Sequence, residues 1–509
     1  PVIFRIIDKL LEEGIENISI TVGYKKEVLR EIVSEQYKNQ CELNFISTDY
    51  NKPPGNSIKT SIENFKEKKL LIILGDTLIN NNLIELIKKG KNFVLTSEKF
   101  SDTKNWCVIT KDGKIIDEIF DKKQLENDKR YDALVGCYFF NNVNLLKSSV
   151  NNFSDEDRLE ISSLIRIIKE KEDFESVNAE KWLDVGHLEN YFLTKQFVLR
   201  TRYFNKLQFD EHGENVVKTS TNNEKLIDEI NWYKSIPKEI SNLVPKILET
   251  SIEKNPFIKL EYIKHPTLSE LWLYGEFSLE FWKQVIEDLF DMIQKFRKYN
   301  KPVTKQEYDA IYLEKTSNRI DELIQTNNFF KKIFEEDFII INGKKLKNWK
   351  LMKDEIKDKI NTMFNKEDNC LIHGDLYFSN ILYDSENKIY KLIDPRGKWG
   401  ESTSGDIKYD IAKIRHSIVG GFDTITNGLY SAEYVNDNEI EYKVFKSKNN
   451  QIISTELDCN IEKNWKLDEI KMIEGLLFIS MLPLHSDNLE RQLAFFCVGI
   501  ERLNEIFGI

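Results

Sequence analysis

The spacing of apolar residues alternates between helical and extended segments along residues 1–195. Apolar side chains recur at helical spacing over residues 2–13 and stop at Gly14, where a left-handed C-cap is expected. The segments "ISITVGY" and "LLIILGD" are apolar runs that predict buried strands, and helical patterns separate them. Strands and helices that alternate in this way predict a mainly parallel, doubly wound α/β sheet, with ligands beyond the carboxyl ends of its strands.

The pattern changes near residue 198. Residues 203–220 alternate and turn at "EHGEN", which predicts an antiparallel hairpin, and residues 224–236 follow with helical spacing. Most of the later chain also has helical spacing. We therefore predict a first domain over residues 1–197, followed by an α+β two-lobed domain with an N-lobe over 198–270 and a helical C-lobe over 271–509.

Composition narrows the class of protein. The net charge of -11 argues against non-specific nucleic-acid binding, which needs basic surface. No stretch approaches the roughly 20 apolar residues of a membrane span, so we expect no membrane partner. The six cysteines are widely spread, without metal-ligand spacing. They predict reduced core residues in a cytoplasmic protein.

Two aspartates of the first region follow apolar runs. Asp76 ends "LLIILGD", and Asp184 lies in "AEKWLDVGHLENYFL" just before Gly186. Two carboxylates at strand ends are suited to hold one Mg²⁺, because this cation takes a few carboxylates together with phosphate oxygens and water. Each residue taken singly also fits a turn former or a helix N-cap, so this pattern alone leaves both interpretations open.

The first region resembles the sugar-phosphate nucleotidyltransferase family along nearly its whole length. The resemblance rests on "PVIFRIIDKLLEEGIENISITVGY", "LIILGD", "ALVGCYFF" and "WLDVGHLENY". It implies a Rossmann-like fold, a sugar-phosphate acceptor and an NTP such as CTP, UTP or GTP.

By the same resemblance, Asp76 and Asp184 are the expected Mg²⁺ ligands. Gly55 and Asn56 are expected near the base or the sugar, and Lys122, in "GKIIDEIFDKK", is expected to bind the phosphosugar.

The glycine-rich loop of this family, which cradles the NTP phosphates with backbone N–H groups, falls before Pro1. The chain starts without Met, inside a helical pattern, so we expect that residues are missing upstream. Without that loop the polypeptide is not expected to transfer a nucleotide. Either the sequence is a fragment, or the domain has lost its activity.

The second region carries residue types suited to bind ATP. Lys218 lies in the predicted strand "VVKTS", and Glu229 lies in the helix that follows. A strand lysine paired with a helix glutamate positions ATP phosphates in kinase-type folds. A solvated lysine on an edge strand is the alternative interpretation of Lys218 taken by itself.

The segment "LIHGDLYFSNILYDSENKIYKLIDPRG" carries the clearest chemical pattern. Asp375 is placed to accept a proton from an attacking hydroxyl, and Asn380, in the same loop, offers a neutral oxygen to Mg²⁺. A predicted hairpin then brings Asp394 beside Asn380 as a second metal ligand.

This segment, over residues 371–397, resembles the catalytic loop and metal-binding strand of the aminoglycoside phosphotransferase and choline kinase family. The resemblance implies ATP and Mg²⁺ as cofactors and a kinase-like fold. It also implies that Asp410 braces the loop, while Asp406 is expected to cap a helix and His373 to pack behind the loop. Arg396, in "DPRG", departs from the family pattern, and we expect it to contact an anionic or polyhydroxylated substrate rather than a loop carboxylate.

Two hypotheses follow for the whole chain. In the first, the kinase phosphorylates a sugar or small alcohol, and the nucleotidyltransferase activates that phosphate for surface polysaccharide such as capsule or lipopolysaccharide. In the second, the first region is an inactive binding module and only the kinase works. Choline or ethanolamine, with CTP-dependent activation, remains an alternative substrate class. A protein kinase is a disfavoured interpretation because the sequence lacks the DFG and APE motifs of that class.

Overall fold

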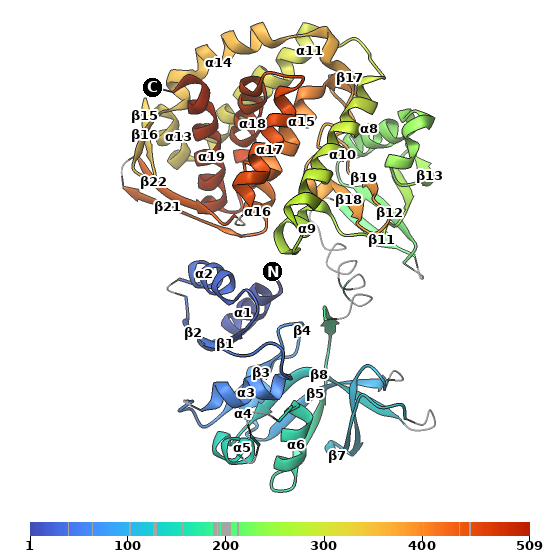
Figure 1. Cartoon of the computed structure of the whole chain (residues 1–509), viewed down its shortest axis with the longest axis vertical. Helices are drawn as coiled ribbons and strands as arrows, with labels where there is room; N and C mark the ends of the chain where they lie inside the picture. The colour runs from blue at the N-terminus through green and yellow to red at the C-terminus, as the bar shows by residue number, and fades with distance from the viewer. Residues whose placement is uncertain are drawn as a thin grey trace. The chain divides into compact units, whose positions relative to one another are not determined.

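The computed structural model describes the chain as two compact units, Pro1–Val198 and Leu199–Ile509 (Figure 1). Figure 1 colours the first unit blue to teal and the second green to red. The described residues are those of 1–509 other than 39, 64, 101–102, 126–129, 152, 155–156, 187–190, 192–193, 195–204, 211–212, 401, 437, 447–448 and 509.

The first unit is built on a mixed sheet with the strand order β3-β8-β5-β9-β7-β6. Two smaller pairs, β1 with β2 and β10 with β4, lie outside this sheet. The strands are β1 (Asn17–Val22), β2 (Glu42–Ser47), β3 (Leu70–Ile73), β4 (Thr77–Ile79), β5 (Asn92–Phe100), β6 (Cys107–Asp112), β7 (Ile115–Asp121), β8 (Tyr131–Phe140), β9 (Phe174–Asn178) and β10 (Trp182–Asp184).

The prediction of a mainly parallel sheet is wrong for the described pairings. Only β1 with β2 and β5 with β9 run parallel, whereas β8 runs antiparallel to β3, β5 and β6. The prediction considered only strands that helices separate. The tight turn at Gly113, with φ +60°, joins β6 to β7, and so short a connection permits only an antiparallel pair.

Strand β8 is buried at every position because both faces of the sheet are covered. Val135, Cys137 and Phe139 pack with helices α1 (Val2–Glu12), α2 (Lys26–Gln36) and α4 (Leu83–Lys88). Tyr138 and Phe140 face the opposite layer of α3 (Pro54–Ile62), α5 (Val143–Val150) and α6 (Ile161–Lys169). The period of two along a strand therefore divides the core of this unit into two layers.

The helix end expected at Gly14 agrees with the structure, and a second helix also ends close to a glycine. Helix α1 stops before Gly14, with φ +76°, and α4 stops before Gly90, with φ +66°. The prediction that the first strand, β1, is buried holds for only one of its two faces. Alternate residues of β1 are exposed, since this pair of strands packs against helices on one face only.

The second unit begins with an antiparallel sheet in the order β11-β12-β14-β13. Its strands are β11 (Asn205–Phe209), β12 (Asn215–Ser220), β13 (Ile247–Ser251) and β14 (Phe257–Glu261). The predicted hairpin is confirmed by the pairing of β11 with β12, although residues 211–212 of its turn lie outside the described part. Helix α8 (Asn223–Ser235) follows, capped by the Asn222 side chain, which accepts from the Lys225 N–H.

The rest of this unit is mostly helical, as predicted. Its longer helices are α9 (Leu268–Tyr274), α10 (Leu279–Arg297), α12 (Lys315–Thr326), α13 (Asn328–Glu335), α14 (Trp349–Met363), α15 (Ile407–Ile418), α17 (Asn450–Glu462), α18 (Leu467–Met481) and α19 (Leu489–Phe507). Short elements connect them, namely α11 (Lys305–Asp309), the π turn η2 (Ala310–Glu314), α16 (Phe422–Thr426) and the 3₁₀ turns η1 (Lys238–Leu243), η3 (Lys366–Asp368), η4 (Phe378–Asn380) and η5 (Leu482–His485). None of the described helices is both long and apolar enough to cross a membrane.

A second sheet, β16-β15-β22-β21, lies within this helical region and was not predicted. Its strands are β15 (Phe338–Ile341), β16 (Lys344–Lys347), β21 (Tyr430–Asn436) and β22 (Glu439–Val444). The turn of the first hairpin is Asn342-Gly343, with φ +48° and +75°. This dipeptide between two apolar or alternating runs is a strong hairpin signal, so the first hairpin was predictable.

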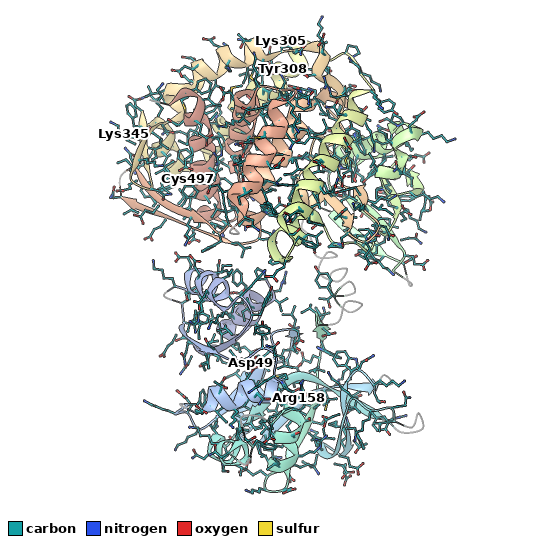
Figure 2. The ribbon with its side chains drawn as sticks, in the orientation of Figure 1. Asp49, Arg158, Lys305, Tyr308, Lys345 and Cys497 are labelled. Atoms are coloured by element: carbon teal, nitrogen blue, oxygen red, sulfur yellow. The ribbon has the colours of Figure 1, made fainter. Side chains whose placement is uncertain are left out.

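Cysteine burial agrees only in part with the prediction of core residues. Cys497 lies on α19 inside the helical unit (Figure 2) and is fully buried, as are Cys137 and Cys370. Cys41 and Cys107 are partly buried, and Cys459 is exposed. All six are free thiols.

Candidate functional site

Asp76 and Asp184 of the first unit lie close together. Strand β10 pairs with β4 in the register that sets Asp184 opposite Thr77, and the Val185 N–H donates to the Asp76 carbonyl at 3.0 Å. A Cβ atom placed on Gly186 would lie 2.5 Å from Asp76 Oδ2 and 3.3 Å from Asp184 Oδ1. The missing side chain at Gly186 thus leaves room for both carboxylates to face one point.

The two carboxylates fit a hard cation. The Asp76 side chain is exposed, and Asp184 is largely buried beneath it. No cluster of three or more His, Cys, Asp or Glu side chains suited to a metal occurs among the described residues. A cation held here would therefore complete its shell with water or with oxygens of a bound phosphate, as Mg²⁺ commonly does.

Gly55 and Asn56 begin α3 and contact a neighbouring loop. The Asn56 amide donates to the Asp157 carbonyl at 2.8 Å and accepts from the Leu159 N–H at 2.9 Å. A Cβ on Gly55 would lie 2.2 Å from the Leu159 carbonyl oxygen, so only glycine fits. These contacts give both residues a structural role, and their contact with a base or sugar stays a prediction.

Lys122 directly follows β7 on the surface of the first unit. Its side chain is exposed and its φ is +40°, an uncommon value for a residue other than glycine. Strained backbone of this kind is enriched at functional positions. The role of Lys122 toward a phosphosugar stays a prediction.

In the second unit, Lys218 of β12 lies between two carboxylates. Its Nζ is 2.7 Å from Glu229 Oε2 of α8 and 2.8 Å from Asp394 Oδ1. Burial alone would lower the pKa of Lys218, but Asp394 and then Glu229 raise it above its ordinary value. Lys218 is therefore a firmly charged, buried lysine rather than a solvated one on an edge strand.

Asp394 and Asn380 are joined by a hairpin of two strands, β18 (Ile381–Asp384) and β19 (Ile389–Leu392). The Asn380 Nδ2 donates to the carbonyls of Asp375 at 3.0 Å and of Asp394 at 3.4 Å. Asp394 adopts φ +53°, a strained value for aspartate. The hairpin thus brings these three residues together, as the sequence predicted.

Asp410 of α15 braces the loop from below. Its carboxylate accepts from the His373 N–H at 2.7 Å and from the Gly374 N–H at 2.8 Å. Asp406 caps the same helix by accepting from the Lys408 N–H. Both contacts agree with the expectations for these aspartates, whose segments meet through β17 (Asn369–Leu371) and β20 (Ser404–Asp406).

His373 packs behind the loop. Its ring lies edge-on to Trp232, with 5.3 Å between ring centroids, and its Nδ1 accepts from the Asp375 N–H at 3.3 Å. Burial lowers the pKa of His373 to about 4, so the ring is neutral at pH 7. A neutral ring that accepts from the backbone fits a structural role.

The Asp375 carboxylate has a cationic partner that sequence analysis missed. Lys413 Nζ lies 3.1 Å from Asp375 Oδ1, and its side chain is 7% exposed. Burial would raise the pKa of Asp375, but Lys413 and then Arg396 hold it below its ordinary value. Asp375 is therefore an ionised carboxylate, as a general base must be. The sequence offers one signal for Lys413: it lies one helical turn after Asp410, so both residues share a face of the same helix.

Arg396 does not pair with a described loop carboxylate. Its Nε donates to the Lys398 carbonyl at 3.2 Å, and its Nη1 donates to the Tyr409 hydroxyl at 3.2 Å. Lys315 of α12, which the sequence analysis also missed, donates to that hydroxyl at 3.1 Å. The Tyr409 hydroxyl is thus the meeting point of two cations.

Comparison with known proteins identifies the first unit. The family model described as "Nucleotidyl transferase" matches residues 1–201. UTP–glucose-1-phosphate uridylyltransferase AglF of Haloferax volcanii is 22% identical over 199 residues, which cover 37% of this chain and 80% of that protein. The bifunctional protein GlmU of Thermoanaerobacter pseudethanolicus is 23% identical over 182 residues, covering 33% of this chain and 38% of that protein.

Solved structures match over a similar share of the chain. UDP-glucose pyrophosphorylase complexed with UDP-glucose is 18% identical, with a TM-score of 0.35, and 40% of this chain and 88% of that chain are covered. HddC from Yersinia pseudotuberculosis complexed with GMP-PN is 18% identical, with a TM-score of 0.32, and the match covers 39% of this chain and 85% of that chain. Nothing in these comparisons identifies the second unit. The N-terminal part of the chain, residues 1–201, is therefore a nucleotidyl transferase domain.

Proposed function

We propose that the second unit is an ATP-dependent kinase of a sugar or other small alcohol, and that the nucleotidyl transferase domain activates the resulting phosphate for surface polysaccharide synthesis. The observation that carries the kinase proposal is the contact of Lys218 with both Glu229 and Asp394. It joins a strand lysine, a helix glutamate and a candidate metal ligand in one buried group, beside the loop of Asp375.

The proposed phosphoryl transfer assigns one task to each group. Asp375 accepts the proton of the substrate hydroxyl as its oxygen attacks the γ-phosphorus of ATP. The bond from the γ-phosphorus to the bridging oxygen breaks, and ADP leaves. Lys218, held by Glu229, orients the ATP phosphates.

Asn380 and Asp394 would hold Mg²⁺, which supplies charge neutralisation to the phosphates when bound. The hydrogen bonds from Asn380 Nδ2 to two backbone carbonyls fix its amide group. Its Oδ1 is then presented in one orientation, as a metal ligand requires. Asp394, on the adjacent strand end, supplies the carboxylate.

In the first unit, Asp76 and Asp184 would hold the Mg²⁺ that neutralises an NTP and a sugar phosphate. The phosphate oxygen of the acceptor attacks the α-phosphorus of the NTP, and pyrophosphate leaves. We assign Lys122 to the phosphosugar, and Gly55 and Asn56 to the base or sugar. Sugar phosphates are the favoured acceptors because the similar AglF is named as acting on glucose 1-phosphate, with UTP as one candidate nucleotide beside CTP and GTP.

An ATP-consumption screen tests the kinase half of this proposal. The protein encoded by the complete reading frame is offered sugars, amino sugars, sugar acids and amino alcohols, and ADP release is measured. The substrate identified should be phosphorylated at least about 1,000-fold more slowly by Asp375→Asn, since the base is lost while the shape is kept. Asp117→Asn, an exposed residue on β7 of the other unit, is the matched control and should keep full activity.

Undiminished phosphorylation by Asp375→Asn would contradict the assigned base. ADP release with none of the alcohols, by a protein that binds ATP, would contradict the kinase proposal as a whole. If the kinase works but no NTP is consumed with its product, the first unit is a binding module.

A further inference from the structure

Three cationic side chains, those of Lys315, Arg396 and Lys413, lie around Tyr409 in the second unit, and Lys413 also pairs with Asp375. Lys315 and Arg319 lie one turn apart on α12, so they share a face of that helix. Arg396 comes from the segment after Asp394, and Lys413 comes from α15. Elements far apart in the chain therefore converge on one place.

The Tyr409 ring binds this cluster together. Ring centroid distances are 5.2 Å to Lys315 Nζ, 5.8 Å to Lys413 Nζ and 5.9 Å to Arg396 Cζ. The electrostatic influence of Lys315, Lys413 and Arg396 also reaches the hydroxyl. Burial alone would raise the pKa of Tyr409, but these three cations lower it to about 8.

The positive charge of the cluster is not balanced within the described part of the chain. Asp375 is the carboxylate that pairs with Lys413. Lys315, Arg319 and Arg396 have no described carboxylate within ion-pair distance, and donate instead to the neutral oxygens of Tyr409, Ser480 and Lys398. Burial lowers the pKa of Lys315 to about 8, which is the sign of a cation held without its counter-charge.

Such an arrangement is costly for folding alone, because a partly buried cation without a carboxylate partner loses part of its hydration. Groups of this kind are typical of a site that a ligand completes. The backbone supports the same conclusion, since Lys315 directly follows the π turn η2, a rare element that is frequent at functional positions.

We infer that the alcohol phosphorylated at Asp375 carries an anionic group, a carboxylate or a phosphate, which Arg396, Lys315 and Arg319 bind. This inference rests on the proposed kinase function and names its substrate class. The guanidinium groups offer paired N–H donors for two anion oxygens, and Lys315 adds a third donor. Arg396 is two residues from Asp394 and touches the Asp375 loop, since its Cβ packs against Gly374. The bound anion would thus lie next to the reacting hydroxyl.

The cluster also argues against choline, ethanolamine and amino sugars. A quaternary ammonium needs open aromatic faces and no competing cations. Here the aromatic faces of Tyr409 and Tyr377 near Asp375 already carry the lysines of the protein. A carboxylate has one advantage over a phosphate as the anion. A phosphorylated sugar acid or hydroxy acid carries only one phosphate group, so the nucleotidyl transferase domain has a single phosphate to use. A substrate that already carries a phosphate would yield a product with two.

The test compares acceptor alcohols of similar size and different charge with the full chain. Glycerol, glycerate, glycerol phosphate and ethanolamine form one set, and glucose, glucuronate, glucose 6-phosphate and glucosamine form another. The best acceptor should be a carboxylate or a phosphate ester, with kcat/KM at least about 100-fold above its neutral and cationic counterparts, because two charged hydrogen bonds are gained. The carboxylate and phosphate members of each set distinguish the two anions.

Variants then locate the binding groups. Arg396→Gln and Lys315→Gln should each raise the KM for the anionic acceptor about 10-fold or more and leave the Kd for ATP unchanged. Lys315→Arg, which keeps the charge, should restore most of the affinity. Lys331→Gln, at an exposed lysine of α13, is the matched control and should change neither value.

Two outcomes would overturn the inference while the kinase proposal stands. The first is an Asp375-dependent phosphorylation in which a neutral or amino alcohol is the best acceptor. The second is an equal loss of turnover with every acceptor in Arg396→Gln and Lys315→Gln, which would assign the cations to the phosphate being transferred. Failure of the kinase proposal is distinct, since no acceptor would then show any dependence on Asp375.

Discussion

At the scale of single residues, the most informative contact is that of Asp375 with Lys413. Burial and the lysine act on the carboxylate in opposite directions, and the net result is a pKa below the ordinary value. A base in this state remains ionised well below neutral pH, so the proposed kinase activity is expected to persist on the acidic side of neutrality. Lys413 is a positioning residue in this account.

Lys413→Met should therefore change the pH profile as well as the rate. Without the lysine, burial dominates and raises the pKa of Asp375, so the acidic limb of the kcat/KM profile should move to higher pH. Lys413→Arg should retain the wild-type limb. The measurement is kcat/KM for the best acceptor from pH 5 to 9, and an unmoved acidic limb in the methionine variant would show that Lys413 does not tune this base.

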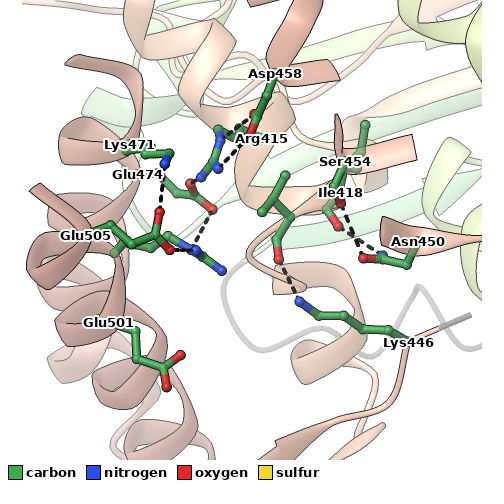
Figure 3. A network of polar contacts seen from close by, with 12 residues as sticks. Arg415, Ile418, Lys446, Asn450, Ser454, Asp458, Lys471, Glu474, Glu501 and Glu505 are labelled. Atoms are coloured by element: carbon green, nitrogen blue, oxygen red, sulfur yellow. Dashed lines mark hydrogen bonds and ion pairs between the residues drawn. The ribbon is translucent and has the colours of Figure 1, made fainter. Parts of the chain in front are cut away.

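At the scale of elements, a network of polar contacts, buried at Arg415 and Glu474, joins four helices of the second unit (Figure 3). Arg415 of α15 donates to Asp458 of α17 at 2.9 Å and 3.1 Å, and also pairs with Glu474 of α18. Lys471 of α18 pairs with Glu505 of α19 at 2.9 Å. These contacts tie α15, which carries Asp410, to α17 and α18, and tie α18 to α19.

Arg415→Met should destabilise this unit by about 3 kcal/mol or more, because Glu474, which is fully buried, loses its main partner. The free energy of unfolding in urea measures the loss. The double variant Arg415→Met with Glu474→Leu should recover part of it, since no unpaired charge then remains at position 474. A double variant less stable than the single one would contradict this account, because it would show that Glu474 is not left without a partner when Arg415 is removed.

The elements also show what the sequence was able to predict. The helices, the β11–β12 hairpin and the grouping of Asp375, Asn380 and Asp394 follow from local spacing, and one tight hairpin carries the last two residues. The antiparallel sheet of the first unit was not predicted, because the spacing of strands and helices reveals neither the tight β6–β7 turn nor the pairing of β8 with strands distant in sequence. Lys315 and Arg319 were missed because a helix distant in sequence brings them to the loop, and helical spacing does not reveal its neighbours. Lys413 sits within the predicted α15 pattern, but its partner lies on the loop.

At the scale of the whole molecule, a nucleotidyl transferase domain precedes a unit whose loop geometry supports phosphoryl transfer. Sequential chemistry gives a reason for both to occupy one chain. Under the proposed function, the second unit makes the phosphate that the first unit consumes, so the two proposed reactions share one intermediate. Order in the chain does not have to follow order in the reaction.

Isotope tracing tests this central claim most directly. The protein of the complete reading frame receives ATP labelled in its γ-phosphate, the best acceptor and one unlabelled NTP at a time, and the products are separated. We expect the label in the acceptor linked to a nucleoside diphosphate, on the phosphate attached to the acceptor. Asp375→Asn should block both the phosphorylated acceptor and this nucleotide-linked product. Asp184→Asn should block only the nucleotide-linked product. Label that stays in the monophosphate with CTP, UTP, GTP and dTTP would contradict the two-step account.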